Sequence, residues 1–261
     1  MNSKLRSWFN VQTLLIVASP TAIVTIWWIW SESADSFFFP PLSEILVEFR
    51  KNWLFERTTT DLAASLRRFT LGYVLAVVLG VGIGATLGLN STIARLTGPL
   101  VEFMRALPPV ALLPFTIVVV GIDDTGKVFL IVLGSIWPIL LNAIDGMKGI
   151  EPALLDAARS YGATPRQILT TVRLPNALPQ IAAGMRSALS IALILTVISE
   201  LFAATEGVGF FILQSQRSFD LTGMWSGMIM LSVVGVTLNV IFDVIEQRVL
   251  SWYRLRAKVA S

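Results

Sequence analysis

Long apolar runs recur along the chain, and short charged stretches separate them. The runs without a charged residue are 11–31, 69–94, 106–122, 128–144, 187–199 and 221–242. A helix that spans a bilayer needs about 20 mostly apolar residues, within a range of roughly 17–25. Run 187–199 is shorter and spans only if Arg186 and Glu200 lie near opposite interfaces, where long side chains reach water. The pattern predicts an all-α polytopic membrane protein with about six transmembrane helices.

We expect the first run to be a retained transmembrane helix. Lys4 and Arg6 precede it, as in a signal peptide, but the run is long and ends in the tryptophan-rich stretch 27–30. Tryptophans are typical of membrane interfaces, and a small-residue cleavage site is missing. More of the Lys and Arg residues fall on the side of the N-terminus, which predicts that both termini are cytoplasmic.

These assignments place the segments of a single membrane domain, 1–261, on the two sides of the bilayer. Segment 32–68 is expected outside the cytoplasm. It contains the pattern Ile45, Leu46, Phe49 and Trp53, which is typical of an amphipathic helix on the membrane surface. Segment 146–180 is expected to form a cytoplasmic loop, and 246–261 a basic cytoplasmic tail.

Run 69–94 carries a small residue at every fourth position. The stripe consists of Gly72, Ala76, Gly80, Gly84 and Gly88. Membrane helices use such stripes to bring backbones close together, because lipid supplies no hydrophobic force between helices. The segment 80–84, GVGIG, does not indicate a nucleotide loop, since no strand precedes it and no Lys-Ser/Thr follows. The stripe therefore predicts helix packing.

Run 106–122 contains Pro108, Pro109 and Pro114, which remove helix hydrogen bonds and kink the chain. Backbone groups freed at membrane depth need protein or water as partners, so this run is a candidate for the translocation path. A kink that serves packing alone is an equal alternative. Glu200 is a second path candidate, as an ionisable residue beside a membrane run, although a place near the interface is the stronger expectation.

Segment 151–180 has the punctuation of two short helices. Pro152 and Pro165 suit first helical turns, Gly162 suits a left-handed helix end, and Thr164 suits an N-cap. Pro175 is expected to stop the second helix and, with Pro179, to bound a stiff link into the fifth span. Helices of about ten residues are too short to persist alone in water. The first one offers a small, partly apolar face, which predicts docking in a partner protein's groove. Its residues are Leu154, Ala157, Ala158 and Tyr161.

The composition agrees with a membrane location: 54% of the residues are hydrophobic, 14% are charged, and the mean hydropathy is +0.72. The net charge of +3 follows from the distribution of Lys and Arg across the membrane, so it predicts no nucleic-acid partner. The chain contains no cysteine and no histidine. Disulfides, thiolate chemistry and the usual zinc sites are thereby excluded. Asp123 and Asp124 are interpreted as turn residues, and we expect no catalytic group and no metal.

The 151–180 segment resembles the cytoplasmic signature of permease subunits in bacterial ATP-binding-cassette importers. That signature reads Glu-Ala-Ala, three residues, Gly, nine residues, Ile-x-Leu-Pro. The matching residues are Asp156, Ala157, Ala158, Gly162, Val172, Leu174 and Pro175. Two of them depart conservatively, Asp for Glu and Val for Ile. Stretches such as FPPLSEIL, RALPPVALLPF and SELFAATEGVGFFI are similar to the nitrate/sulfonate/taurine branch of these permeases.

The resemblance implies a type I importer permease in the bacterial inner membrane, itself neither an enzyme nor the holder of a cofactor. It implies four kinds of partner: a second copy or a close paralogue, a cytoplasmic ATPase dimer that binds ATP and Mg, an extracytoplasmic substrate-binding protein, and the lipid bilayer. The chain has no Walker-type loop, in keeping with a separate ATPase. The implied solutes are small anions or organic acids such as nitrate, sulfonates or taurine.

Two other functions remain open from the residues. An ion-gradient-driven carrier would need ionisable groups at mid-membrane, which the apolar runs hardly supply. A membrane scaffold without transport activity would use the 151–180 helices as a simple interaction module.

Overall fold

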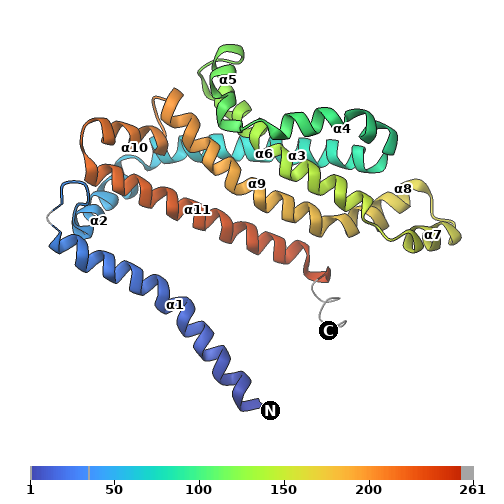
Figure 1. Cartoon of the computed structure of the whole chain (residues 1–261), viewed down its shortest axis with the longest axis horizontal. Helices are drawn as coiled ribbons and strands as arrows, with labels where there is room; N and C mark the ends of the chain where they lie inside the picture. Colours follow the sequence, from blue (N-terminus) through green and yellow to red (C-terminus); the bar gives the residue numbers. More distant parts are fainter. Residues whose placement is uncertain (1, 35, 254–261) are drawn as a thin grey trace. The chain divides into compact units, whose positions relative to one another are not determined.

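The computed structural model describes residues 2–34 and 36–253, and every regular element in these residues is a helix (Figure 1). The α-helices are α1 (Asn2–Ser33), α2 (Leu42–Lys51), α3 (Ala63–Leu89), α4 (Ser91–Ala106), α5 (Leu113–Val119), α6 (Asp124–Lys148), α7 (Pro152–Ser160), α8 (Pro165–Gln167), α9 (Leu174–Ala203), α10 (Val208–Arg217) and α11 (Leu221–Val249). Short π-helical turns are η1 (Asn52–Glu56), η2 (Thr58–Leu62) and η4 (Ile168–Arg173), and η3 (Pro109–Leu112) is a 3-10 turn. The predicted all-α class is confirmed.

Four helical stretches are long and apolar enough to cross a bilayer: Thr58–Leu89, Asp124–Lys148, Pro165–Phe202 and Leu221–Val249. A fifth candidate is the pair Ser91–Ala106 and Pro109–Val119, which bends by 89° at its break. The first predicted run lies in α1, where many side chains, including those of Lys4 and Arg6, are outside the described residues. Residues 254–261 of the predicted basic tail are outside them as well.

Run 106–122 is not the single kinked span that the sequence predicted. The Asn90 side chain accepts hydrogen bonds from the N–H groups of Thr92 and Ile93, and thereby begins a separate amphipathic helix, α4. That helix ends at Ala106 because Pro108, which is followed by a second proline, takes an extended conformation. The chain therefore bends by 89° at these prolines, so the predicted kink is a break between two helices.

The chain forms two units, Met1–Thr58 with Phe211–Met230, and Thr59–Phe210 with Leu231–Ser261. In the first unit, Trp53 is buried, donates its indole N–H to Ser226 Oγ at 3.3 Å, and meets the Phe211 ring edge-on. The α2 helix buries Ile45 and leaves Leu46 exposed, as an amphipathic helix does.

In the second unit, α6 packs against α3 and α9 (Figure 1). The small-residue stripe of α3 faces α6: a Cβ added to Gly72 would lie 2.5 Å from Ile131 Cγ2, and one added to Gly84 would lie 2.6 Å from the Leu140 carbonyl oxygen. Ala76 is fully buried in the same contact, and Gly80 and Gly88 approach Ile139 and Met147. Gly82, which lies off the stripe, has open space around it.

The α6–α9 contact also depends on glycines, which have no side chain to keep the two backbones apart. A Cβ on Gly146 of α6 would lie 3.0 Å from the Ala177 carbonyl oxygen, and one on Gly184 of α9 would lie 2.6 Å from the Pro138 carbonyl oxygen. Backbones at such distances fit only where a residue lacks a side chain. These two glycines were not singled out in the sequence.

The expected stop at Pro175 is wrong, since the chain stays helical from Pro165 to Phe202. The π-helical turn η4 directly precedes α9, and Pro175 lies in the first turn of α9. A π turn adds a residue to the helical ladder and leaves an N–H without a regular partner, so a proline, which has no N–H, is tolerated beside it. The 151–180 segment therefore joins the fifth span through continuous helix and not through a link.

Candidate functional site

Within the predicted loop 146–180, helix α7 ends in a tight left-handed turn. Gly162 has φ +76°, its N–H donates to the Arg159 carbonyl, and the Ala163 N–H donates to the Ala158 carbonyl at 3.1 Å. A glycine adopts this conformation without strain, whereas other residues do so at a cost. The helix end predicted at Gly162 is confirmed.

The second arm of the loop begins at a capping box. The Thr164 Oγ1 accepts the Gln167 N–H, and the Gln167 side chain accepts the Thr164 N–H at 2.8 Å. This pair satisfies backbone donors that a helix start leaves open. Because the box fixes where α8 begins, it also sets the direction of the helical arm that continues through η4 into α9.

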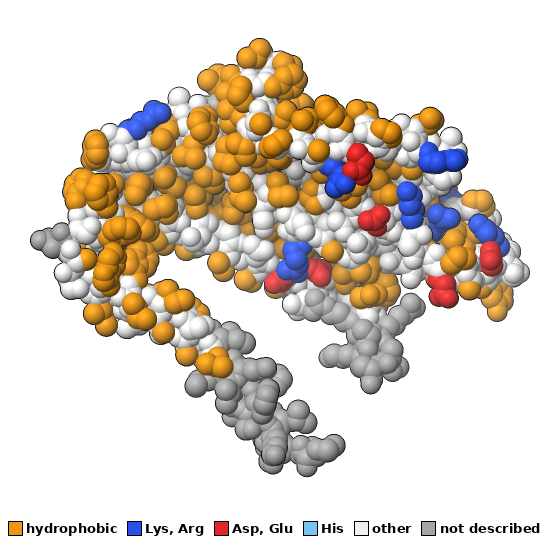
Figure 2. Space-filling view, viewed as in Figure 1, with side chains coloured by type: hydrophobic (Ala, Val, Ile, Leu, Met, Phe, Trp, Pro, Cys, Tyr) orange, Lys and Arg blue, Asp and Glu red, His pale blue; other side chains and the backbone are white. Residues whose placement is uncertain are grey.

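The face of α7 predicted to dock is open to solvent. Tyr161 is 92% exposed, Leu154 and Ala157 are exposed, and Ala158 is partly exposed. Asp156 lies on the same helix, and its Oδ1 accepts a hydrogen bond from Arg159 at 3.0 Å. On the second arm, Leu174 is exposed, while Val172 and Pro175 are partly buried. In Figure 2, hydrophobic side chains cover most of the long helices on the face that is shown. Most of the charged side chains on this face lie near α4 and α7.

The base of the loop is anchored in the core of its unit. Ala143 and Met147 of α6 form a buried cluster with Ala177 and Ile181 of α9. Ile168 of η4 is also buried, and α7 contacts η4. A force applied to α7 would therefore pass into α6 and α9 through packed side chains.

The proline-rich break lies next to α6 and α9. The ring of Pro109 occupies the space where a side chain on Gly134 of α6 would be, and Leu195 of α9 reaches the same place. Thr116 of α5 turns its hydroxyl back to the Leu112 carbonyl, and Pro114 lies in the first turn of that helix. The role of these prolines in a translocation path stays a prediction.

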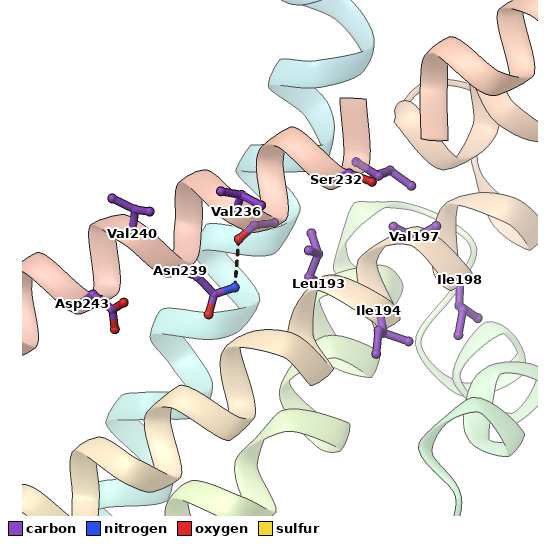
Figure 3. A pocket seen from close by; sticks show the side chains of 11 residues that line it. Leu193, Ile194, Val197, Ile198, Ser232, Val236, Asn239, Val240 and Asp243 are labelled. Carbon is purple, nitrogen blue, oxygen red and sulfur yellow. Dashed lines mark hydrogen bonds between the residues drawn. The ribbon is translucent and has the colours of Figure 1, made fainter. Parts of the chain in front are cut away.

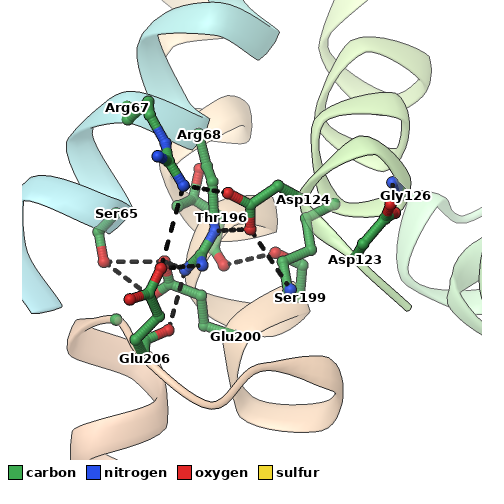
Figure 4. Close-up of polar contacts among 12 residues, drawn as sticks. Ser65, Arg67, Arg68, Asp123, Asp124, Gly126, Thr196, Ser199, Glu200 and Glu206 are labelled. Atoms are coloured by element: carbon green, nitrogen blue, oxygen red, sulfur yellow. Dashed lines mark hydrogen bonds and ion pairs between the residues drawn. The ribbon is translucent and has the colours of Figure 1, made fainter. Parts of the chain in front are cut away.

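An ion cluster that the sequence analysis did not find joins α3, α6, α9 and the turn before α10 (Figure 4). Its centre is Arg68, which is 2% exposed. Arg68 donates to Asp124 Oδ1 at 2.6 Å, to Glu200 Oε1 at 3.0 Å, and to the carbonyl and the carboxylate of Glu206. Arg67 also pairs with Asp124, on the exposed side of the cluster.

Glu200 is 1% exposed and lies beneath the turn that leads into α10. It accepts hydrogen bonds from the Ser65 hydroxyl at 2.8 Å and from the Gly209 N–H at 3.0 Å, in addition to Arg68. Gly207 has φ +121°, and a Cβ there would lie 2.4 Å from the Glu200 carboxyl carbon. Glu200, near the end of α9, thus belongs to a buried ion pair in which Arg68 offsets its charge. Its place near the interface and its part in a translocation path stay predictions.

One sequence signal pointed toward this cluster. Arg68, Asp124 and Glu200 each stand at the end of an apolar run, where a charge is either solvated or paired. Asp123 acts as the expected turn residue, since its side chain accepts the Gly126 N–H and caps α6. The interpretation of Asp124 as a turn residue was incomplete, because its carboxylate binds both arginines.

Comparisons with known proteins agree on one kind of protein. The family model described as "Binding-protein-dependent transport system inner membrane component" matches residues 76–251. The taurine transport system permease protein TauC of Escherichia coli (strain K12) is 30% identical over 250 residues, which cover 93% of this chain and 90% of TauC. The nitrate import permease protein NrtB of Leptolyngbya laminosa is 28% identical over 189 residues, covering 72% of this chain and 68% of NrtB.

A solved structure shares the fold. The structure titled "Inward facing conformations of the MetNI methionine ABC transporter" contains a chain with a TM-score of 0.64 and 24% identity to this one. The match covers 72% of this chain and 94% of the other. The matched part of this chain therefore shares the fold of that chain.

Proposed function

We propose, because the chain belongs to the family of binding-protein-dependent transport system inner membrane components, that it forms the membrane pathway of an ATP-driven importer. The chain is a multi-pass membrane protein and a transport subunit. Its solute is a small anion or organic acid, in line with the taurine and nitrate named for its relatives. A second copy or a close paralogue completes the pathway.

The observation that carries this proposal is the exposed face of α7. Leu154 of α7 and Tyr161 directly after it are exposed, with Ala157 and Ala158 between them at helical spacing. An exposed apolar patch of this kind on a short helix is a docking surface for another protein. Its partner is a cytoplasmic ATPase dimer, which binds ATP and Mg, while this chain binds neither.

The topology follows from the same partner. An ATPase in the cytoplasm places the loop 146–180 and both termini on that side of the bacterial inner membrane. Segment 32–68 then faces outward, where a substrate-binding protein delivers the solute.

Continuous helix supports a mechanical role for the loop. The helical stretch Pro165–Phe202 has no link at which motion of the loop would be lost. The loop is also fixed to α6 by the buried cluster around Ala143 and Ala177. When the ATPase dimer closes, α7 moves with it, and α6 and α9 shift as nearly rigid bodies between inward- and outward-facing arrangements.

The proposal is tested with Ala158→Glu in the complete transporter, reconstituted with its ATPase and binding protein. A charge forced into a closed protein interface without a partner costs about 3–5 kcal/mol, so ATPase co-purification and uptake of labelled taurine or nitrate should fall at least about 100-fold. Arg159→Glu is the control, because Arg159 is exposed on the side of α7 away from the docking face. Both variants should insert into the membrane normally.

Gly162→Pro gives an independent test. Proline requires φ near −65°, whereas Gly162 has φ +76°, so the turn after α7 cannot form. Normal ATP-dependent uptake in both Gly162→Pro and Ala158→Glu would rule out docking through this loop. Uptake that stops with a protonophore while ATP is held constant would instead indicate an ion-driven carrier.

A further inference from the structure

One side of α9 exposes polar and small residues along half of the helix. Five exposed residues follow one another at spacings of three and four, from the end next to the loop 146–180 to the middle of α9. Residues at these spacings lie on the same side of an α-helix. They form what we call the polar face of α9: Asn176, Gln180, Ala183, Ser187 and Ser190.

Contacts with α6 set the depth of this face in the membrane. A Cβ at Gly184 of α9 would lie 2.6 Å from the Pro138 carbonyl oxygen, and Leu195 of α9 reaches the space beside Gly134. With a rise of 1.5 Å per residue, Pro138 and Gly134 each lie about 3 Å from the middle of α6. The two serines of the polar face lie between Gly184 and Leu195 along α9, so they are near the middle of the hydrocarbon core.

The Gln180 amide lies in the core as well. Its Nε2 donates to Asn142 Oδ1 at 2.8 Å, and Asn142 lies about 9 Å from the middle of α6, inside a core about 30 Å thick. The Gln180 side chain makes this one hydrogen bond among the residues that the structure describes, although an amide has two N–H donors and an accepting oxygen. Hydrocarbon offers no partner to the remaining groups, so Gln180 needs water or a polar neighbour.

The exposed sides of neighbouring helices are mainly apolar at similar depth. On α3 they include Leu71, Val74, Leu75, Val78 and Leu79. On α11 they include Val236, Val240, Ile241 and Val244. Such surfaces suit lipid. The polar face of α9 differs from them in the same unit of the chain, which indicates that it meets something other than lipid.

The same side of α9 becomes apolar beyond the middle of the helix. The next exposed residue along it is Ile194, which is 55% exposed, and Ile198 follows one turn later. Figure 3 shows these two side chains on one side of α9, whereas Leu193 points toward α11. Closely packed membrane helices carry small residues along their whole contact. A polar half followed by an apolar half instead suits a space that holds water at one end and excludes it at the other.

We propose that the polar face of α9 lines a water-filled vestibule that opens to the cytoplasm, ends near Ile194 and conducts a small oxyanion. This inference rests on the proposed function, which gives the orientation in the membrane, the solute class and a second copy as the opposite wall. Serine hydroxyls and the Gln180 amide donate hydrogen bonds without carrying charge, so they attract an oxyanion and still release it. Arg186 is turned away from this face toward α11, where it pairs with Asp243.

Single thiols test where water reaches, because the chain has no cysteine. The assembled transporter is studied in inside-out membrane vesicles with the anionic, membrane-impermeant reagent 2-sulfonatoethyl methanethiosulfonate. Only a thiolate reacts, and hydrocarbon keeps a thiol protonated. Ser187→Cys and Ser190→Cys should therefore react at least about 100-fold faster than the control Val78→Cys on the apolar side of α3. Ile194→Cys, on the same side of α9 as the serines, should react at least about 10-fold more slowly than Ser190→Cys.

The charge of the reagent tests the solute class. The cationic reagent 2-trimethylammonioethyl methanethiosulfonate is compared with the anionic one, and each rate is divided by the rate of the same reagent with free cysteine in water. Ser187→Cys should then favour the anionic reagent by about threefold or more, because hydrogen-bond donors line the vestibule. Equal corrected rates, or a preference for the cation, would refute conduction of an oxyanion.

Reaction of both serine positions as slowly as Val78→Cys would overturn the vestibule. Efficient disulfide formation between two copies of such an unreactive Ser187→Cys would assign the face to a packed second chain, and no disulfide would assign it to lipid. Labelling after denaturation in sodium dodecyl sulfate confirms that each thiol is present. Failure of this inference differs from failure of the proposed function, because the thiol reaction needs no ATP, whereas the proposed function fails if the wild-type transporter shows no ATP-driven uptake.

Discussion

Removal of the Arg68 guanidinium should destabilise the protein far more than removal of its neighbour. Arg68→Met leaves Glu200 buried, with hydrogen bonds from the Ser65 hydroxyl and the Gly209 N–H but without its ion-pair partner. Breaking a buried ion pair by deleting one partner costs about 3–5 kcal/mol, because the remaining charge is uncompensated. Arg67→Met is the control: the Arg67 side chain is 59% exposed, and an exposed ion pair contributes about 1 kcal/mol or less.

A double variant identifies the cause of the loss. In Arg68→Met/Glu200→Gln the buried charge is gone, so we expect the free energy of unfolding to return to within about 2 kcal/mol of the wild type. The measurement is unfolding by sodium dodecyl sulfate in mixed micelles, followed by the helical circular dichroism signal. If Arg68→Met loses no more free energy than Arg67→Met, or if Glu200→Gln adds to the loss, the ion pair does not hold the ends of α3 and α9 together.

Three further predictions concern single backbone positions and use the same unfolding measurement. Gly84→Ala should lower the free energy of unfolding by about 1–3 kcal/mol, because its Cβ would meet the Leu140 carbonyl oxygen at 2.6 Å, whereas Gly82→Ala should be neutral or slightly stabilising. Phe219→Gly should stabilise by about 1 kcal/mol, because Phe219 has φ +59° and is 70% exposed; an unchanged or lower stability would contradict this. Gly162→Ala should weaken the turn after α7 by about 1 kcal/mol and lower ATPase co-purification modestly, and full co-purification would show that the turn tolerates a side chain.

Local structure in the 146–180 loop was predictable because it depends on near neighbours. Pro152, Gly162 and Thr164 act within one helical turn of their own positions, and each does what its residue type favours there. Pro175 was misjudged for a related reason. Proline usually ends a regular α-helix, but here a π-helical turn precedes it and changes the hydrogen-bond register of the helix. No residue type predicts such a turn.

The sequence alone determined that this is a helical membrane protein, where its apolar runs lie, and that a short polar loop between them carries the spacing of an importer signature. These features follow from the lengths and periods of apolar residues, which each segment carries by itself. Only the tertiary structure decided which residues meet. Arg68 and Glu200 are 132 positions apart, and although each stands at the end of an apolar run, the sequence does not indicate that they pair with one another. The small-residue stripe of α3 predicted a close contact with another helix, but it did not predict that this helix would be α6. Which two helices fit together depends on the shapes of both surfaces, and neither segment's sequence contains that information by itself.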